Sequence, residues 1–317
     1  MTKFIKFTFY IILVFTFSSC DAQVRPTPEA SFQQINPNEF NAYWYAGKAE
    51  LTHFDITQVR YGEKRPSDAV LIYVTEDFLP DKQVKKEFGD DKSISILKLN
   101  SVKKFTTGIY DYSIMTSVFT PLDFRKYPST LKLTFSSQEW CGQSFAQMNM
   151  RNGKLHYQER SYFQAEGDVD ETLTATYVEE DIWTRIRIEP QMLPFGKIKM
   201  VPSQEFMRLS HKPLKAYDAE ATLVLQVNDQ KSGGEEFYIY TLRYPELDRT
   251  LKISCQSTFP YKIMSWEETK NASNPAKALT TEAVARKTMN LPYWELNKNE
   301  NQVYRDSLGL KYGIIGE

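Results

Sequence analysis

The chain has 317 residues, of which 41% are hydrophobic, 14% aromatic and 25% charged. This composition is typical of a folded globular chain and excludes a largely disordered one. The formal net charge of -1 argues against a nucleic-acid partner, because binding to phosphates needs a concentrated positive field. The length suggests about two domains, although an all-β fold of this size can form a single unit.

The first twenty residues carry the clearest signal in the chain. Lys3 and Lys6 come before an almost unbroken apolar run at 7–17, and two serines then lead to Cys20. The run is too short to cross the roughly 30 Å hydrocarbon layer of a bilayer as a permanent helix. It therefore predicts a removable signal peptide over residues 1–19. An uncleaved N-terminal anchor helix is the alternative.

The residues Phe17-Ser18-Ser19-Cys20 resemble the lipobox of bacterial lipoproteins, in the looser Ser-Ser-Cys version common in Bacteroidota. The resemblance implies that the Cys20 thiol is joined to diacylglycerol, that the peptide is cut before it, and that the new N-terminus receives a further acyl chain such as palmitate. More than one chain gives stable membrane anchoring. Asp21 is the one acid among the next five residues. The resemblance therefore favours a place in the cell envelope, on the periplasmic face of the outer membrane.

Two more cysteines, Cys141 and Cys255, remain in the mature chain. An even pair in an oxidising compartment permits a disulfide between them. Two unpaired cysteines in separate strands are equally ordinary. Both alternatives stay open.

The body after the signal peptide divides into a tether and a β domain. Residues 20–40 hold three prolines among polar residues and are expected to tether the body to the membrane. Over residues 41–268 the apolar side chains recur with a period of two, which predicts half-buried antiparallel strands. The alternation is clearest at 131–135, 182–188 and 221–227. The segment Val70–Val74 is apolar on both faces, which predicts a central strand.

Two turn signals predict which strands pair. Asn152-Gly153 separates 143–151 from 154–163, and Asn-Gly is the preferred pair for a two-residue hairpin turn. This register places Met150 opposite Leu155 and Met148 opposite Tyr157. Gly233-Gly234 similarly joins 221–228 to 235–244.

The last segment, 269–317, changes character. Residues 281–287 are predicted to form a short helix, followed by an Asn-rich polar tail. We therefore expect an all-β protein, with a single large antiparallel sheet curled into an open or closed barrel and a short C-terminal helical segment.

Catalytic and metal-binding motifs are absent from the sequence. There is no phosphate-binding loop, dinucleotide fingerprint, zinc-protease motif or C-x-x-C pair. His53, His156 and His211 are far apart in the chain, so no metal site is predicted. The carboxylates at 166–170 and 179–181 are predicted to lie in solvated turns. No catalytic residue and no cofactor is predicted, and an enzymatic role is not favoured.

Aromatic side chains crowd the predicted strands. They form either an ordinary core or the lining of a cavity for an apolar or sugar ligand. If such a ligand pocket exists, Trp44, Tyr110, Trp140 and Trp183 are its candidate lining.

Three stretches, 43–51 (Tyr-Trp-Tyr-Ala-Gly-Lys-Ala-Glu-Leu), 69–76 and 136–143, together resemble an uncharacterised lipoprotein family of Bacteroidota. Its members are sometimes labelled septum formation inhibitor Maf. The phosphate-binding signature of the Maf nucleotide pyrophosphatases has no counterpart in this chain. The opening of residues 43–51 is also similar to periplasmic open-barrel proteins of the lipoprotein-carrier kind, a likeness of fold that predicts function weakly.

These observations support three functional hypotheses. The first is a membrane-anchored lipoprotein with a non-enzymatic binding or envelope-assembly role, whose curled sheet holds a lipid or another apolar ligand. The second is an envelope hydrolase that acts on glycan or lipid through carboxylates brought together by the fold. The third is a structural scaffold with a filled core. A deep apolar concavity favours the first, and two carboxyl groups about 5–9 Å apart in a cleft favour the second.

Overall fold

The computed structural model describes residues 36–174, 176–227 and 236–310. The predicted signal peptide, Cys20 and most of the predicted tether lie outside these residues. Helix α1 (Pro37–Trp44) begins within the last part of the predicted tether. No helix in the described part of the chain is long and apolar enough to cross a membrane.

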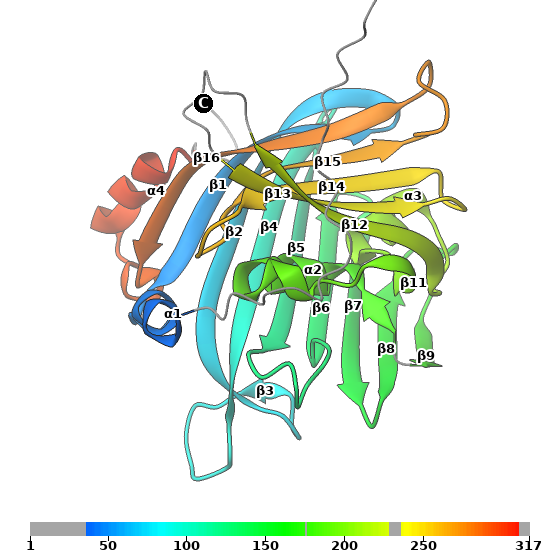
Figure 1. Cartoon of the computed structure of the whole chain (residues 1–317). Coiled ribbons are helices and arrows are strands. Elements are labelled where there is room, and N and C mark those ends of the chain that lie inside the picture. Colours follow the sequence, from blue (N-terminus) through cyan, green and yellow to red (C-terminus); the bar gives the residue numbers. More distant parts are fainter. Residues whose placement is uncertain (1–35, 175, 228–235, 311–317) are drawn as a thin grey trace, which may run out of the picture.

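Sixteen strands form one large sheet, shown in Figure 1. In chain order they are β1 (Ala49–Arg60), β2 (Glu63–Leu79), β3 (Val84–Lys85), β4 (Ile94–Thr107), β5 (Tyr110–Pro121), β6 (Lys132–Glu139), β7 (Gly142–Arg151), β8 (Lys154–Ser161), β9 (Val169–Thr174), β10 (Tyr177–Val178), β11 (Gly196–Val201), β12 (Tyr217–Val227), β13 (Glu236–Tyr244), β14 (Arg249–Gln256), β15 (Ile263–Lys270) and β16 (Leu279–Leu291).

The strand order places the middle of the chain at both edges of the sheet. Neighbours run β10-β11-β12-β13-β14-β15-β16-β1-β2-β4-β5-β6-β7-β8-β9, with β3 paired to β2 off this path. Only β10 and β11 pair in parallel; the other described pairs are antiparallel. The edge strands β9 and β10 are consecutive in the chain, yet the sheet is not closed between them. The prediction of one large curled antiparallel sheet is confirmed in its open form.

The helices lie around and inside this sheet. Helix α2 (Glu179–Ile188) lies in the concavity, α3 (Gln204–Ser210) connects β11 to β12, and α4 (Val303–Leu308) is the short C-terminal helix (Figure 1). Three short 3-10 turns complete the described structure, at η1 (Pro190–Met192), η3 (Tyr293–Glu295) and η4 (Asn299–Gln302).

Strands β12 to β15 cross in front of the first half of the sheet, with α2 enclosed between the two halves (Figure 1). Aromatic rings connect the two halves of the sheet and α2. The ring centroids of Phe54 in β1 and Trp266 in β15 are 4.7 Å apart, and those of Trp266 and Trp183 in α2 are 5.1 Å apart. These side chains belong to one continuous hydrophobic core with residues from both halves.

The hairpin predictions are confirmed where the structure describes them. Strands β7 and β8 pair with Met150 opposite Leu155 and Met148 opposite Tyr157. Asn152 and Gly153 have φ values of 50° and 69°, as the two-residue turn requires. Strand β2, which contains Val70–Val74, is central, with β1 on one side and β4 on the other. Strands β12 and β13 pair as predicted, while Gly233-Gly234 lies outside the described residues.

Two predictions of secondary structure are wrong. Residues 182–188 form most of helix α2, because their surroundings bury every side of the segment. Residues 281–287 lie in strand β16, which is hydrogen-bonded between β15 and β1. The sheet therefore continues past the predicted boundary at 268 to Leu291, and the C-terminal helix lies at 303–308 instead.

Candidate functional site

Helix α2 fills the concave side of the sheet. All of its residues are buried except Trp183, which is half-buried. Three acidic residues at 179–181 form its first turn, and Arg185 and Arg187 lie in its last. This arrangement complements the helix dipole, which favours negative charge at the N-terminus and positive charge at the C-terminus. The acidic group at 179–181 is therefore buried, and the prediction that it lies in a solvated turn is wrong.

Buried ion pairs connect both ends of α2 to the sheet. The Arg249 guanidinium of β14 donates to both carboxylate oxygens of Glu179, at 2.5 and 2.7 Å. Arg187 donates to both oxygens of Glu50 in β1, at 2.5 and 2.8 Å. A buried charge is tolerated only when it is paired and hydrogen-bonded. Because one partner of each pair lies on α2 and the other on the sheet, a shift of the helix would leave buried charges unpaired.

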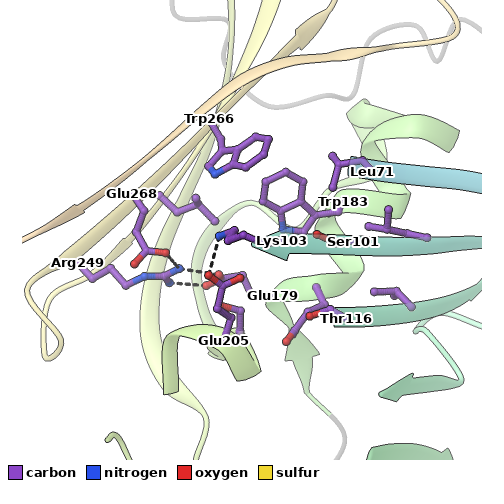
Figure 2. A pocket seen from close by; sticks show the side chains of 15 residues that line it. Leu71, Ser101, Lys103, Thr116, Glu179, Trp183, Glu205, Arg249, Trp266 and Glu268 are labelled. Carbon is purple, nitrogen blue, oxygen red and sulfur yellow. Dashed lines mark hydrogen bonds and ion pairs between the residues drawn. The ribbon is translucent and has the colours of Figure 1, made fainter. Parts of the chain in front are cut away.

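A cavity of about 80 Å³ lies between α2 and the two halves of the sheet, shown in Figure 2. Its walls combine leucine and tryptophan side chains with charged groups. Lys103 donates to Glu205 at 2.6 Å, and in the same group of charges Arg249 donates to Glu268 at 3.0 Å (Figure 2). The lining residues are Leu71, Leu99, Ser101, Lys103, Thr116, Val118, Glu179, Glu180, Trp183, Ser203, Glu205, Arg249, Leu251, Trp266 and Glu268.

Glu180 is the cavity's unusual carboxyl group. Its Oε1 accepts a hydrogen bond from the backbone N–H of Gln204 at 2.6 Å, whereas its Oε2 has no partner among the described residues. Burial raises the pKa of Glu180 to about 8, against the opposing backbone hydrogen bond and with a further contribution from the neighbouring charge of Glu179. The group is therefore protonated at neutral pH. The cavity has room for a water molecule that completes its hydrogen bonding.

Glu268, in the same cavity, has the opposite protonation state. Burial alone would raise its pKa, but the positive charges of Arg249 and Lys270 more than offset this and lower the pKa to about 2. Two carboxyl groups with pKa values driven apart are a recognised feature of acid–base sites. Glu268, however, accepts from Arg249 at 3.0 Å and is committed to that ion pair.

The four aromatic residues predicted to line a ligand pocket do not come together. Trp183 lines the cavity beside α2. Trp44 is buried against Tyr73, Trp140 is exposed in the turn between β6 and β7, and the Tyr110 hydroxyl donates to that of Tyr61 at 3.3 Å. The residues that do converge include six charged side chains, and sequence reasoning did not bring these together. The only local signal for them was the acidic start and basic end of α2.

The predicted alternative of a disulfide does not hold. Cys141 and Cys255 are both free thiols. Cys141 is exposed in the turn between β6 and β7, whereas Cys255 is buried in β14 and burial raises the pKa of its thiol to about 12.

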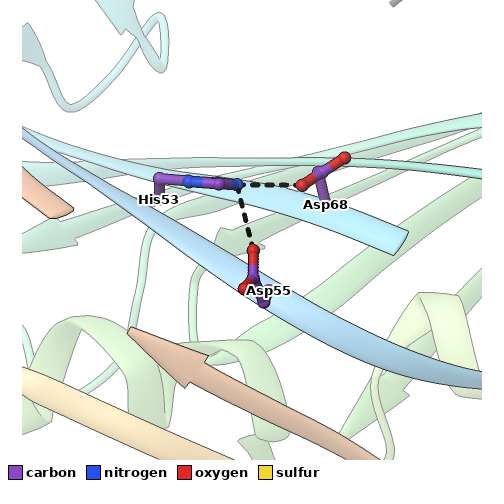
Figure 3. A group of neighbouring side chains, drawn as sticks. All are labelled: His53, Asp55 and Asp68. Atoms are coloured by element: carbon purple, nitrogen blue, oxygen red, sulfur yellow. Dashed lines mark hydrogen bonds and ion pairs between the residues drawn. The ribbon is translucent and has the colours of Figure 1, made fainter. Parts of the chain in front are cut away.

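Three side chains on β1 and β2 could offer ligands to a metal ion, as shown in Figure 3. His53 Nε2 lies 2.9 Å from Asp68 Oδ1 and 3.8 Å from Asp55 Oδ1, and the ligand atoms lie within 4.8 Å of one another. They line an open groove of about 1250 Å³. Sequence reasoning missed this group because Asp68 lies on a different strand from His53 and Asp55, and only the strand pairing brings the three together. The register of β1 and β2 places Asp55 directly opposite Asp68.

Hydrogen bonds already occupy the atoms of this group that face one another. The Arg286 guanidinium donates to Asp55 Oδ2 at 2.5 Å and neutralises one carboxylate. The His53 ring is buried, and its Nδ1 has no partner in the described part of the chain. A proton on Nδ1 would lack an acceptor, so we assign the ring proton to Nε2, which donates to Asp68. A metal at Nε2 would require the less favourable tautomer.

The comparisons with known proteins give no relative. No family model, no curated protein and no solved structure matches this chain.

Proposed function

We propose that the protein is a membrane-anchored lipoprotein of the cell envelope with a non-enzymatic binding or assembly role carried by its outer surface. The observation that supports this most is the position of α2, which fills the concavity of the sheet. The remaining cavity, at about 80 Å³, is far below the roughly 300–1,000 Å³ of typical ligand pockets. A long acyl chain enclosed in the sheet is therefore less well supported than a surface role.

The anchor itself rests on the sequence 17–20 and its resemblance to a lipobox. Cys20→Ser should abolish incorporation of a palmitate analogue and move the protein from the membrane fraction to the soluble one. Cys141→Ser is the matched control, because that thiol is exposed in the folded body and should leave labelling and fractionation unchanged. Labelling that persists in Cys20→Ser and disappears in Cys141→Ser would refute the anchor.

The surface role is tested by native mass spectrometry of the mature chain carrying Cys20→Ser, purified gently from a periplasm. We expect the bare polypeptide mass, equal to the mass measured after organic extraction. A reproducible extra mass, lost on extraction and identified as lipid or glycan, would show that the concavity opens to hold a ligand and would refute the surface role.

One observation favours a second candidate, the envelope hydrolase. Glu180 and Glu268 line one cavity and have pKa values of about 8 and about 2. A hydrolase would release sugars or fatty acids from envelope glycan or lipid, and Glu180→Gln should abolish that release. The cavity accommodates a few water molecules at about 80 Å³, so the non-enzymatic role is the better supported of the two.

A further inference from the structure

Four successive turns at one end of the sheet each expose a large apolar side chain. They are Tyr61 between β1 and β2, Ile109 between β4 and β5, Trp140 between β6 and β7, and Tyr162 after β8. The exposed fractions are 58%, 83%, 69% and 78%. Because the strands β1-β2-β4-β5-β6-β7-β8 are antiparallel neighbours in that order, these turns lie side by side along one edge. We call these four residues the tip row.

Contacts join the turns of the tip row in two pairs. The Tyr61 hydroxyl lies 2.9 Å from that of Tyr112 and 3.3 Å from that of Tyr110, which connects the first turn to the second. The ring of Tyr162 lies over Gly142 and would come within 2.9 Å of a Cβ at that glycine, which connects the third turn to the fourth.

Turns elsewhere in the described sheet differ. The β13–β14 turn (245–248) and the β15–β16 turn (271–278) expose no large apolar side chain, although both are fully described. At the opposite end of the first half, the β7–β8 turn is Asn152-Gly153 and exposes no large apolar side chain. In the loop between β3 and β4, Phe88 is the single exposed aromatic residue. A run of exposed apolar groups on a soluble surface marks an interaction site.

The chemistry of the tip row fits the headgroup layer of a membrane. Tyrosine and tryptophan combine an apolar ring with a polar end, and both are enriched where bilayer meets water. No member of the row is charged. Glu63 and Glu139, which flank two of its turns, are paired with Arg65 at 3.0 Å and with Arg208 at 3.4 Å, so neither adds an uncompensated charge beside the row. The row is therefore suited to zwitterionic headgroups and to contacts that salt does not weaken.

The length of the chain before α1 allows this contact, provided that the proposed anchor at Cys20 is correct. The 16 residues from Cys20 to residue 36 can extend to about 53 Å. The tip row lies at the far end of β1 from α1, a distance of about 40 Å along its 12 residues. An acylated Cys20 can therefore lie in the same bilayer that the row touches.

We propose that the tip row, Tyr61, Ile109, Trp140 and Tyr162, inserts into the headgroup layer of the membrane that holds the acyl anchor. The anchor supplies the attachment, and the row sets the orientation by holding this end of the sheet against the bilayer. The rest of the body, including the concavity with α2, then takes a defined direction relative to the membrane surface.

The native chain provides a probe for the test at Cys141, beside Trp140. Cys141 is exposed, Cys255 is buried, and Cys20 is acylated in the proposed mature form. The acylated full chain, labelled at Cys141 with an environment-sensitive fluorophore, is incorporated into phosphatidylcholine vesicles with and without a lipid-borne quencher. The matched control carries the same label at Lys126→Cys in a Cys141→Ser chain, in the exposed loop between β5 and β6 at the opposite end.

We expect blue-shifted emission and strong quenching at Cys141, unchanged at high salt, and aqueous emission without quenching at the control position. Replacing Tyr61, Ile109 and Tyr162 with serine should remove the shift while vesicle flotation stays complete, because the anchor is intact. Equal, aqueous emission at both positions in a floating protein would overturn the proposal but leave the anchor standing. A chain that lacks the acyl mass and fails to float would overturn both.

Discussion

The pKa of Glu180 is raised by its burial at the centre of this protein. Its carboxyl group adjoins the ionised pair of Glu179 with Arg249, and α2, α3 and the sheet shield it from bulk solvent. In such surroundings the neutral form is the stable one, and the group keeps its proton at a pH at which an exposed glutamate loses it.

The pKa of Glu180 predicts how stability depends on pH. Between its usual value of 4.5 and its native value of about 8, the native state binds a proton that the unfolded state has released. This contribution to stability is fully present below pH 4.5 and is lost as the pH rises to about 8, by about 1.4 kcal/mol per pH unit. Glu180→Gln should flatten this decline in denaturant unfolding measured from pH 5 to pH 8. The exposed Glu267→Gln should leave the decline unchanged, and a decline that survives in Glu180→Gln would show that another group causes it.

At the scale of elements, α2 is the part that the sequence pattern misrepresents. Its isoleucines and threonine favour a strand by intrinsic preference, and their alternation with larger residues matches a period of two. A helix that is buried on every side has no polar face, so its 3.6-residue period does not appear in the sequence. The ion pairs at its two ends join it to distant strands, and the local pattern cannot reveal them.

The ion pair between α2 and β14 should therefore be costly to break. Arg249→Met leaves the buried carboxylate of Glu179 and the half-buried carboxylate of Glu268 without their shared cation, which should lower the free energy of unfolding by about 3–5 kcal/mol. Arg243→Met on the adjacent strand removes an exposed pair with Glu220 and should cost less than about 1 kcal/mol. Urea unfolding of both variants measures the difference. Equal losses would mean that α2 does not depend on this contact.

Strand β16 presents the opposite case, a good helix former that becomes a strand. Residues 281–287 contain two alanines and three charged residues, and Glu282 and Arg286 have the i,i+4 spacing that suits a helix. Partners on both sides, β15 and β1, satisfy its backbone hydrogen bonds, and the small Ala283 pairs with the bulky Trp266 across the sheet. Pairing with two strands overrides the local preference. In β7 and β8 the alternation of apolar residues and the turn both favour strands, so local preference and strand pairing agree.

At the scale of the whole molecule, the two body cysteines lie in opposite halves of the sheet and in different surroundings. Cys141 occupies an exposed turn at the tip row, and Cys255 lies in the core of β14. The sheet is thus stabilised by its strand pairing and its core, without a covalent connection between the halves.

Counting thiols tests this directly in the mature acylated chain. One thiol should react with a chromogenic disulfide reagent in the native state, and two after unfolding in denaturant without a reductant. Burial, which raises the pKa of Cys255 to about 12, keeps the second thiol unreactive until the sheet opens. Cys141→Ser should abolish the native reaction. A chain that gives no thiol in denaturant until it is reduced would contain the bridge after all.

Short-range chemistry controls the period of the strands, the Asn152-Gly153 hairpin with its register and the all-β class, so these could be predicted from the sequence. The helical state of α2, the strand at β16 and the buried charged cavity depend on long-range contacts. The partners in those contacts are far apart along the chain. Glu179 and Arg249 are 70 residues apart, and Glu50 and Arg187 are 137 residues apart. No local pattern encodes such pairs, and they form only when the curled sheet brings its two halves together around the helix.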